Sequence, residues 1–337
     1  MPLRFAKHFR FSAEKLSQLF WQVLVVIVVL YVMGSLWQTV SHNLAARNIK
    51  TGFDFLKQEA SFDISEKFLV SFSAKDSFAK AFWVGILNTI KVSAIGIFFS
   101  IILGTLLAFA KVSQHLLLKK MASAYIEFIR NIPLLIQLFF WYTLITESLP
   151  LARNALQPLP GVFLCNRGLF IPTYTIMNTE LGSHWGWVTP KLVGFNFIGG
   201  AHLTPEFTAL LLALILYTTA FVAETVRAGI QSIPKGQNDA CIALGLTRLQ
   251  SLRFVILPQA LRVIIPPLTS QMLNLTKNSS LALAIGYPDV VGIANITINQ
   301  TGQAIEGVVL IMAVYLTLSL LTSFLMNLYN KRIQFVS

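Results

Sequence analysis

The stretch that decides the fold is NDACIALGLTRLQSLRFVILPQALR, residues 238–262. It begins with small residues, carries one glycine and several basic side chains, and has a proline near its end. Long apolar runs lie on both sides of it, so a short amphipathic segment is held between segments that favour lipid. A plain connection between two spans could be a few residues long. The stretch therefore indicates either a surface offered to another protein or a solvated, charge-dotted loop.

The composition places the chain in the membrane class. Of its 337 residues, 55% are hydrophobic and only 12% are charged, and the mean hydropathy is +0.67. Soluble domains carry about 25% charged residues. The net charge of +12 could indicate nucleic acid binding. The basic residues lie between apolar runs and not on one soluble face, however, so no nucleic acid partner is expected.

A helix needs roughly 20 apolar residues to cross a bilayer, and the sequence predicts about six such helices. The apolar runs are Phe20–Val40, Phe82–Ala110, Asn131–Thr146 (in a helix starting near Ala122), Phe207–Ala223, Leu261–Gly286 and Gly307–Asn330. Lys and Arg favour the cytoplasmic side, and their excess in the alternate short loops favours both termini inside. We therefore expect an all-α integral membrane protein.

Two short helices are expected within the opening stretch. Gln237–Leu244 is long enough for two turns, and Asp239 sits near their start, where its charge meets the positive end of the helix dipole. Gly245 suits a helix end that needs positive φ. Thr247 suits the cap of a second helix, Arg248–Leu257. This spacing predicts a pair of helices joined at a glycine elbow.

The spacing resembles the EAA loop of ABC-importer permeases, in which E-A-A, three residues, G, nine residues, I, one residue and L-P follow in order. Asp239-Ala240-Cys241 stand at the first three places, Gly245 at the glycine, and Val255 with Leu257-Pro258 complete the pattern. In that family the loop is the coupling helix that seats in a cleft of the ATP-hydrolysing subunit. The resemblance implies that residues 237–258, including Leu244, couple this chain to such an ATPase.

Other segments resemble the polar and general L-amino-acid branch of that family. They include YIEFIRNIPLLIQLFFWY (125–142) and LPQALRVIIPPLTSQMLNLTKNSSLALAIGYPD (257–289). The resemblance covers roughly residues 80–145 and 190–335 and implies the type I ABC-importer permease fold in the bacterial inner membrane. The implied partners are a cytoplasmic ATP-binding subunit that holds ATP and Mg²⁺, a second permease subunit (a paralogue by family precedent), a periplasmic amino-acid-binding protein and the amino acid itself.

This resemblance and the apolar runs divide the chain. Residues 1–19 are expected to form a cytoplasmic segment, 20–40 an additional transmembrane helix, 41–80 a periplasmic loop and 81–335 the permease domain, with a periplasmic insertion at 146–206 and the cytoplasmic coupling loop at 228–258. The insertion is expected to be irregular, with short strands and turns towards GWVTPKLVGFNFIGG. The first apolar run exceeds a signal-peptide core in length, and cleavage near NLAAR stays the alternative.

Intramembrane polar residues give the candidate substrate pathway: Lys277, Asn278, Ser279, Ser280, Pro266 and Pro267. Leu261 to Lys277 is about 24 Å of helix at 1.5 Å per residue, so Lys277 lies within the membrane, where an unpaired charge is costly. It could attract a substrate carboxylate, or it could pair with another span or reach outward. The two prolines should free carbonyls, which is tolerated where backbone lines a cavity.

Three other features are expected to be structural. Glu224 and Arg227 are three apart on one helix face and should form an ion pair. Lys91, near the outer end of its span, should extend towards the interface. Pro133 should bend the third helix.

No catalytic chemistry is legible in the sequence. It contains no G-x-x-x-x-G-K-[ST] phosphate loop, no Ser-His-Asp set, and no metal-ligand spacing among its five histidines and two cysteines. We therefore expect no enzyme activity, no metal and no cofactor on this chain itself. The alternatives to an importer subunit that moves amino acids by alternating access are an ion-gradient-driven amino-acid transporter, which predicts inverted repeats and buried acids, and a non-transporting scaffold.

Overall fold

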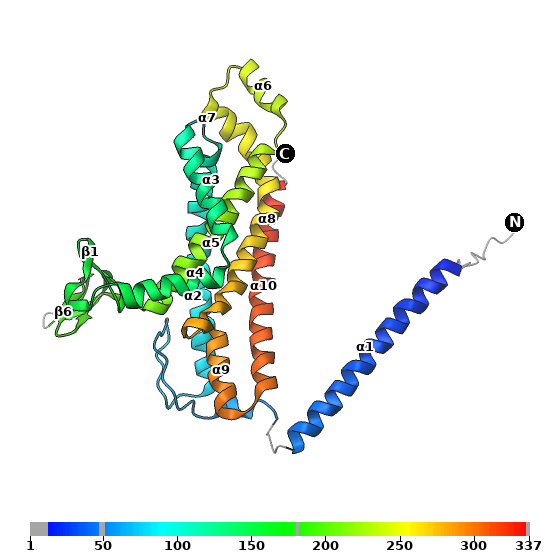
Figure 1. Cartoon of the computed structure of the whole chain (residues 1–337), viewed down its shortest axis with the longest axis vertical. Coiled ribbons are helices and arrows are strands. Elements are labelled where there is room, and N and C mark those ends of the chain that lie inside the picture. The colour runs from blue at the N-terminus through cyan, green and yellow to red at the C-terminus, as the bar shows by residue number, and fades with distance from the viewer. Residues whose placement is uncertain (1–12, 47–50, 180–181, 335–337) are drawn as a thin grey trace. The chain divides into compact units, whose positions relative to one another are not determined.

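The chain folds as two units, residues 1–53 and residues 54–337. The computed structural model describes residues 13–46, 51–179 and 182–334 (Figure 1). The first unit holds one helix of 34 residues, α1 (Ala13–Ala46). The large apolar side chains between Leu19 and Trp37 are exposed on it. A helix that is apolar on every side is suited to lipid.

The second unit is built on helices. The long ones are α2 (Phe78–Val112), α5 (Pro205–Gln231), α8 (Leu257–Asn278) and α10 (Ala304–Gln334), and the shorter ones are α3 (Leu116–Asn131), α4 (Leu134–Thr143), α6 (Lys235–Ala243), α7 (Arg248–Ser251) and α9 (Val290–Thr301). Figure 1 shows α6 and α7 at one end of this unit and α9 at the other. Across the described residues, five helices are long and apolar enough to cross a membrane, or six if α3 and α4 make one span.

A glycine brings α2 and α5 together. A Cβ added at Gly104 would lie 2.5 Å from Cγ1 of Val222 and 3.0 Å from the carbonyl oxygen of Thr219. Small residues allow this close approach between helices in a membrane. Gly104 therefore fixes how tightly α5 lies against α2.

The third expected span is broken and not merely bent. α3 ends at Asn131, and α4 starts at Leu134 with a bend of 100° between them. Pro133 lacks an N–H, and the residue before a proline avoids the helical region, so Ile132 adopts φ −101° and ψ 126°. The side-chain amide of Gln137 donates to the carbonyl oxygens of Ile129, at 3.0 Å, and of Ile132, at 2.9 Å. The break is therefore a stable element with satisfied carbonyls.

The fifth expected span keeps its helix through both prolines. Pro266 and Pro267 lie inside α8, which ends at Asn278 and continues as a 3₁₀ segment, Ser279–Ile285. Gly286, with φ +77°, ends that segment. Asp289 then caps α9, because its Oδ1 accepts a hydrogen bond from the N–H of Gly292 at 2.7 Å.

The insertion between α4 and α5 contains strands, so the expectation of a largely irregular loop there is wrong. A π-helical turn, Leu144–Ser148, and a 3₁₀ turn, Ala152–Asn154, lead into β1 (Leu156–Leu159), β2 (Val162–Cys165), β3 (Gly168–Ile171), β4 (Thr173–Thr179), β5 (Gly182–Val188), β6 (Lys191–Val193), β7 (Asn196–Ile198) and β8 (Ala201–Leu203). They form one antiparallel sheet in the order β1-β2-β3-β8 and two hairpins, β4-β5 and β6-β7. The term all-α therefore describes the helical body, and the short strands expected near GWVTPKLVGFNFIGG extend through most of the insertion.

Residues 54–77 pack onto the helices, where an outside loop was expected. Their buried side chains Phe55, Ile64 and Phe72 join a core with Phe82 of α2 and Ile293 of α9. The buried apolar area stabilises the segment against the ends of both helices.

Lys91 is paired inside the protein, so the expectation that it reaches the interface is wrong. It forms an ion pair with Glu66, and the exposed fractions of the two side chains are 15% and 6%. The other carboxylate oxygen of Glu66 accepts from Oγ1 of Thr204 at 2.8 Å, and Nζ of Lys91 lies 4.1 Å from the ring centroid of Phe207. The pair thus ties residues 54–77 to α2 and to the start of α5.

Candidate functional site

The first part of the site is the helix α6. It begins at Lys235, two residues before the expected start, and its first turn contains no acid. Asp239 therefore lies in the second turn, away from the helix N-terminus. Asp239 and Ala240 are exposed, whereas Cys241 is buried.

Gly245 makes the elbow after α6. Its φ is +71°, as the sequence predicts. The N–H of Leu246 donates to the carbonyl of Cys241 at 3.0 Å, and the N–H of Gly245 donates to that of Ile242 at 2.9 Å. This pair of bonds is the Schellman arrangement, which ends a helix at a residue with left-handed backbone.

Thr247 and Gln250 cap the start of the second helix, because the side chain of each accepts a hydrogen bond from the backbone N–H of the other. Oγ1 of Thr247 accepts from the N–H of Gln250 at 3.3 Å, and Oε1 of Gln250 accepts from the N–H of Thr247 at 2.9 Å. This capping box satisfies two amides that have no partner within the helix.

The second helix runs into α8 without interruption. α7 is followed by a π-helical segment, Leu252–Ile256, and Leu257 and Pro258 occupy the first turn of α8. Val255 is half-buried in the π-helical segment. Nε2 of Gln259 also donates to Oε1 of Gln237 at 3.3 Å, which ties α8 back to α6. This hydrogen bond and the continuous helical run from Arg248 therefore join α6 to the start of α8.

Four large apolar side chains are exposed on this loop, and we call them the docking surface. They are Ile242, Leu244, Leu249 and Phe254, with exposed fractions of 65%, 78%, 74% and 64%. Apolar side chains gathered on one exposed element mark a site of protein contact. The geometry therefore supplies a pair of short helices with exposed apolar side chains at the end of the helical unit.

An ion cluster joins the last part of α5 to the end of α2. Glu224 contacts Arg227 one turn along α5, and its Oε2 lies 3.0 Å from Nζ of Lys111 at the end of α2. Lys111 was missed by sequence reasoning because it comes from another helix. The cluster holds the end of α2 to α5 as well as supporting α5 itself.

A furrow with polar and apolar walls runs between α5 and α8, and Arg130 of α3 borders its larger part. It consists of two adjoining hollows of about 220 and 490 Å³ that share Phe221 and Gln271. The smaller is also lined by Tyr217, Thr218, Asn274, Leu275 and Asn278, and the larger by Arg130, Glu224, Thr225, Ala228, Gly229, Ser232, Val263 and Pro267. Open hollows with a few polar groups among apolar walls are typical of small-molecule sites.

The expected pathway residues are only partly brought together. Asn278 and Pro267 line the furrow, whereas Pro266 and Lys277 are exposed and are not among its lining residues. Lys277 has no ion-pair partner within residues 13–46, 51–179 and 182–334. Ser279 and Ser280 donate to the carbonyls of Thr276 and Lys277 at 2.7 and 2.8 Å, so both hydroxyls support the helix end.

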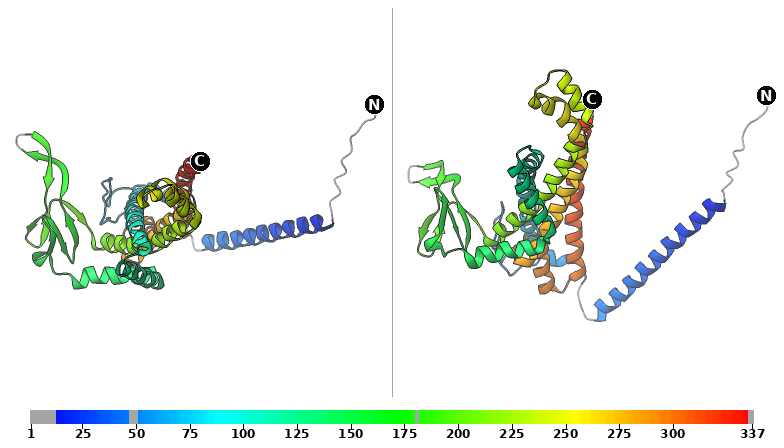
Figure 2. Two further views of the ribbon diagram at one scale, coloured as in Figure 1. Left: turned by 90° about the horizontal axis from the view of Figure 1, so that it is seen from above. Right: turned by 45° about the horizontal axis from the view of Figure 1, so that its top comes forward.

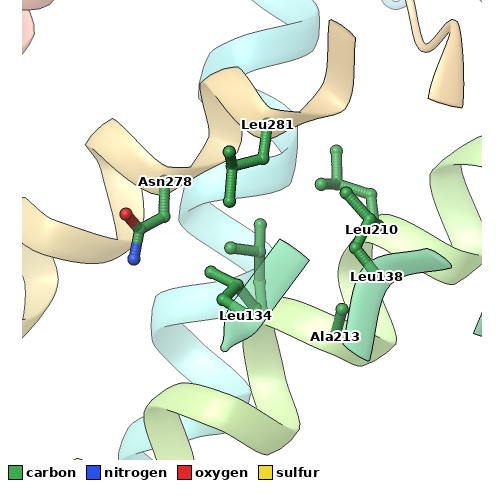
Figure 3. Close-up of a pocket in the computed structure, with 7 residues that line it drawn as sticks. Leu134, Leu138, Leu210, Ala213, Asn278 and Leu281 are labelled. Atoms are coloured by element: carbon green, nitrogen blue, oxygen red, sulfur yellow. The ribbon is translucent and has the colours of Figure 1, made fainter. Parts of the chain in front are cut away.

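Asn278 also borders a small apolar hollow, where it faces leucines of α4 and α5 (Figure 3). This hollow is too small to hold a water molecule. In the described part of the chain, no group of three or more His, Cys, Asp or Glu side chains could hold a metal ion. The furrow is therefore a place where the described residues leave room for a small molecule.

Membrane-length helices, a furrow between two of them and a loop with exposed apolar side chains at one end are typical of a transporter's transmembrane subunit. Residues 96–335 match the family described as "Binding-protein-dependent transport system inner membrane component". The chain belongs to this family of inner-membrane transport components.

Curated relatives are similar over nearly the whole chain. One is the "Putative amino-acid ABC transporter permease protein YhdX" of Escherichia coli, 43% identical over 94% of this chain and 94% of the relative. Another is the "General L-amino acid transport system permease protein AapQ" of Rhizobium johnstonii, 38% identical over 96% of this chain and 93% of the relative.

Solved structures share the fold. A chain of an amino acid ABC transporter crystallised with histidines has a TM-score of 0.54 and 29% identity, over 76% of this chain and 95% of that one. A chain of the MetNI methionine ABC transporter, inward facing, has a TM-score of 0.51 at 18% identity, over 76% of this chain and 97% of that one. The fold is that of type I ABC-importer permeases.

Proposed function

We propose that this chain is the permease subunit of an importer that moves amino acids across the inner membrane and takes its energy from a separate ATPase. The docking surface carries the proposal. Its four exposed apolar side chains stand on two helices that the Schellman elbow and the capping box hold stiffly. The names of the relatives support amino acids as the substrate class.

The partners follow from this arrangement. An ATP-binding subunit seats on the docking surface from the cytoplasm and holds ATP with Mg²⁺, since this chain has no phosphate loop. A second permease subunit, a paralogue, completes the pathway, and a periplasmic amino-acid-binding protein delivers the substrate. Both termini face the cytoplasm, because the short loops on that side are rich in Lys and Arg. Residues 20–40 form an additional span outside the shared core of residues 81–335.

The mechanism is alternating access driven through α6. Closure of the ATPase partners moves α6, and the unbroken run from Thr247 through α8 passes that motion to one wall of the furrow. Gln271, Asn274 and Asn278 offer amide groups along that wall, and amides hydrogen-bond both the carboxylate and the ammonium of an amino acid. The expected attraction between Lys277 and the substrate carboxylate becomes a secondary part of the proposal, because Lys277 lies outside the furrow.

The experiment that tests the proposal is photo-crosslinking from the docking surface. A benzoylphenylalanine at position 244 should capture a nucleotide-hydrolysing protein in native membranes. The control is the same probe at Leu69, which is 80% exposed and lies outside the docking surface, and it should not capture that protein. Failure at 244, or equal capture from both positions, refutes the proposal.

A further inference from the structure

An aromatic face projects from the insertion and has no partner within the described residues. The β4-β5 hairpin pairs Tyr174 with Trp187 and places Trp185 opposite Ile176. Residues directly opposite each other, and residues two apart on a strand, share a face. Tyr174, Trp185 and Trp187 therefore lie on one face, and we call this the aromatic face.

The aromatic side chains contact one another and are otherwise exposed. The ring centroids of Tyr174 lie 5.7 Å from Trp185 and 5.5 Å from Trp187. Their exposed fractions are 56%, 61% and 67%, in the order Tyr174, Trp185, Trp187. A free two-stranded hairpin is marginally stable in water, and β4-β5 is a separate two-stranded sheet. The two strands of the hairpin alone do not bury the aromatic side chains of this face.

The insertion cannot move far from the membrane. β8 ends at Leu203, and the membrane-length helix α5 begins at Pro205, so one residue joins the four-stranded sheet to a span. The aromatic hairpin is attached to that sheet through one residue, because β3 ends at Ile171 and β4 begins at Thr173. Figures 1 and 2 show the strands beside the helices of this unit, beyond α4, and not stacked on either end of them.

The charges on the insertion favour an anionic surface. Within residues 149–179 and 182–203, the fully charged side chains are Arg153, Arg167 and Lys191, all basic and all exposed. The guanidinium of Arg153 lies 4.1 Å from the ring centroid of Phe195, whose side chain is also exposed. The sequence adds one acid, Glu180, which lies outside the described residues.

We propose that the insertion is a membrane-interface anchor whose aromatic face lies in the headgroup layer of the bilayer around the permease. Trp and Tyr collect at this level because they join an apolar ring to a polar N–H or O–H. Basic side chains beside them contact phosphate groups of anionic lipids. The anchor holds the Pro205 end of α5 at a fixed depth in the membrane.

The test places a fluorescent label on either face of the hairpin. Trp187→Cys and Tyr174→Cys carry the label on the aromatic face, and Thr175→Cys carries it on the opposite face as the matched control. The unsubstituted chain is the labelling blank, since Cys165 and Cys241 are both buried. The full chain, with the subunits that co-purify with it, is placed in nanodiscs of phosphatidylethanolamine and phosphatidylglycerol containing nitroxide-labelled phosphatidylcholine.

Quenching by the nitroxide lipid should be about twofold or more stronger at positions 187 and 174 than at 175, since only the aromatic face meets the interface. Equal quenching on both faces overturns the proposal. So does a blue-shifted label at 187 that the nitroxide lipid does not quench, because that result means that another protein covers the face.

Discussion

Gly245 is the residue whose backbone decides the shape of the docking surface. Its φ of +71° costs a side-chain-bearing residue roughly 1–2 kcal/mol, although space for a Cβ is free. We expect Gly245→Ala to lower ATP-driven amino-acid uptake in proteoliposomes by distorting the elbow, with the amount of inserted protein unchanged. Gly236→Ala is the control, because Gly236 lies inside α6 with open space around it. Equal uptake by both variants would contradict the prediction.

The Glu66–Lys91 pair is the most enclosed ion pair among the described residues. Lys91→Met leaves the carboxylate buried without its cation, which should cost about 3–5 kcal/mol of unfolding free energy. Glu66→Gln combined with Lys91→Met removes the charge and should restore a large part of that loss. Thermal unfolding in detergent measures both effects.

Lys80→Met is the matched control for that comparison. Lys80 pairs with Asp76 at 3.0 Å, and both side chains are more exposed, so its loss should cost less than about 1 kcal/mol. If Lys91→Met costs no more than Lys80→Met, the buried pair contributes little to stability.

Sequence patterns within a few positions predicted the conformation or role of some residues and missed the partners of others. The conformation of Gly245 and the capping role of Thr247 follow from neighbours within a few positions, and the sequence predicted both. The partner of Lys91 is 25 positions away in the chain, in a segment expected to be a periplasmic loop. The pairing therefore depends on tertiary packing that no local pattern encodes.

At the scale of elements, the α3–α4 break depends on Gln137. Its buried amide serves the carbonyls of Ile129 and Ile132. Gln137→Met leaves these carbonyls without that donor and should destabilise the chain by about 1–3 kcal/mol. The control is Ile136→Met at the next position, which is 58% exposed and should change stability by less than about 0.5 kcal/mol. Similar unfolding temperatures for the two variants would show that the break needs no such donor.

The sequence predicted the long apolar helices well. It predicted the short strands of the insertion least well. Phe82–Ala110 became part of α2, and Gly307–Asn330 part of α10, because a long apolar run permits little besides a membrane helix. The strands of the insertion are three to seven residues long and have few regular alternations. Their arrangement depends on packing between separate sheets, such as Phe170 of β3 against Phe197 of β7, and the sequence therefore predicted turns more readily than sheets.

At the scale of the whole molecule, the furrow is the proposed path for substrate. Gln271 lines both hollows, so Gln271→Leu should raise the KM for amino-acid uptake about tenfold, corresponding to about 1.4 kcal/mol of lost binding. Crosslinking from position 244 should persist, because the docking surface is untouched. Lys277→Gln is the comparison and should stay within about twofold of the unsubstituted chain. The reverse order of effects would place the path at Lys277.

The membrane class, the two short helices on either side of Gly245 and the resemblance to importer permeases could be derived from the sequence, because each rests on composition or short spacing. The furrow could not, because Gln271 and Thr218 meet only when α5 and α8 pack together. The helical periodicity of each segment gives its faces but not which face its neighbour covers.

Thr204 fixes the start of α5 to the rest of the helical unit. Its hydroxyl accepts from the N–H of Phe207 at 3.2 Å and donates to Glu66 at 2.8 Å, and its backbone follows β8 directly. The far part of α5 is tied to the end of α2 by the ion pair of Glu224 with Lys111. A tilt of α5 about Thr204 should therefore carry the end of α2 with it, and the two helix ends should move together beside the residues that lead into α6.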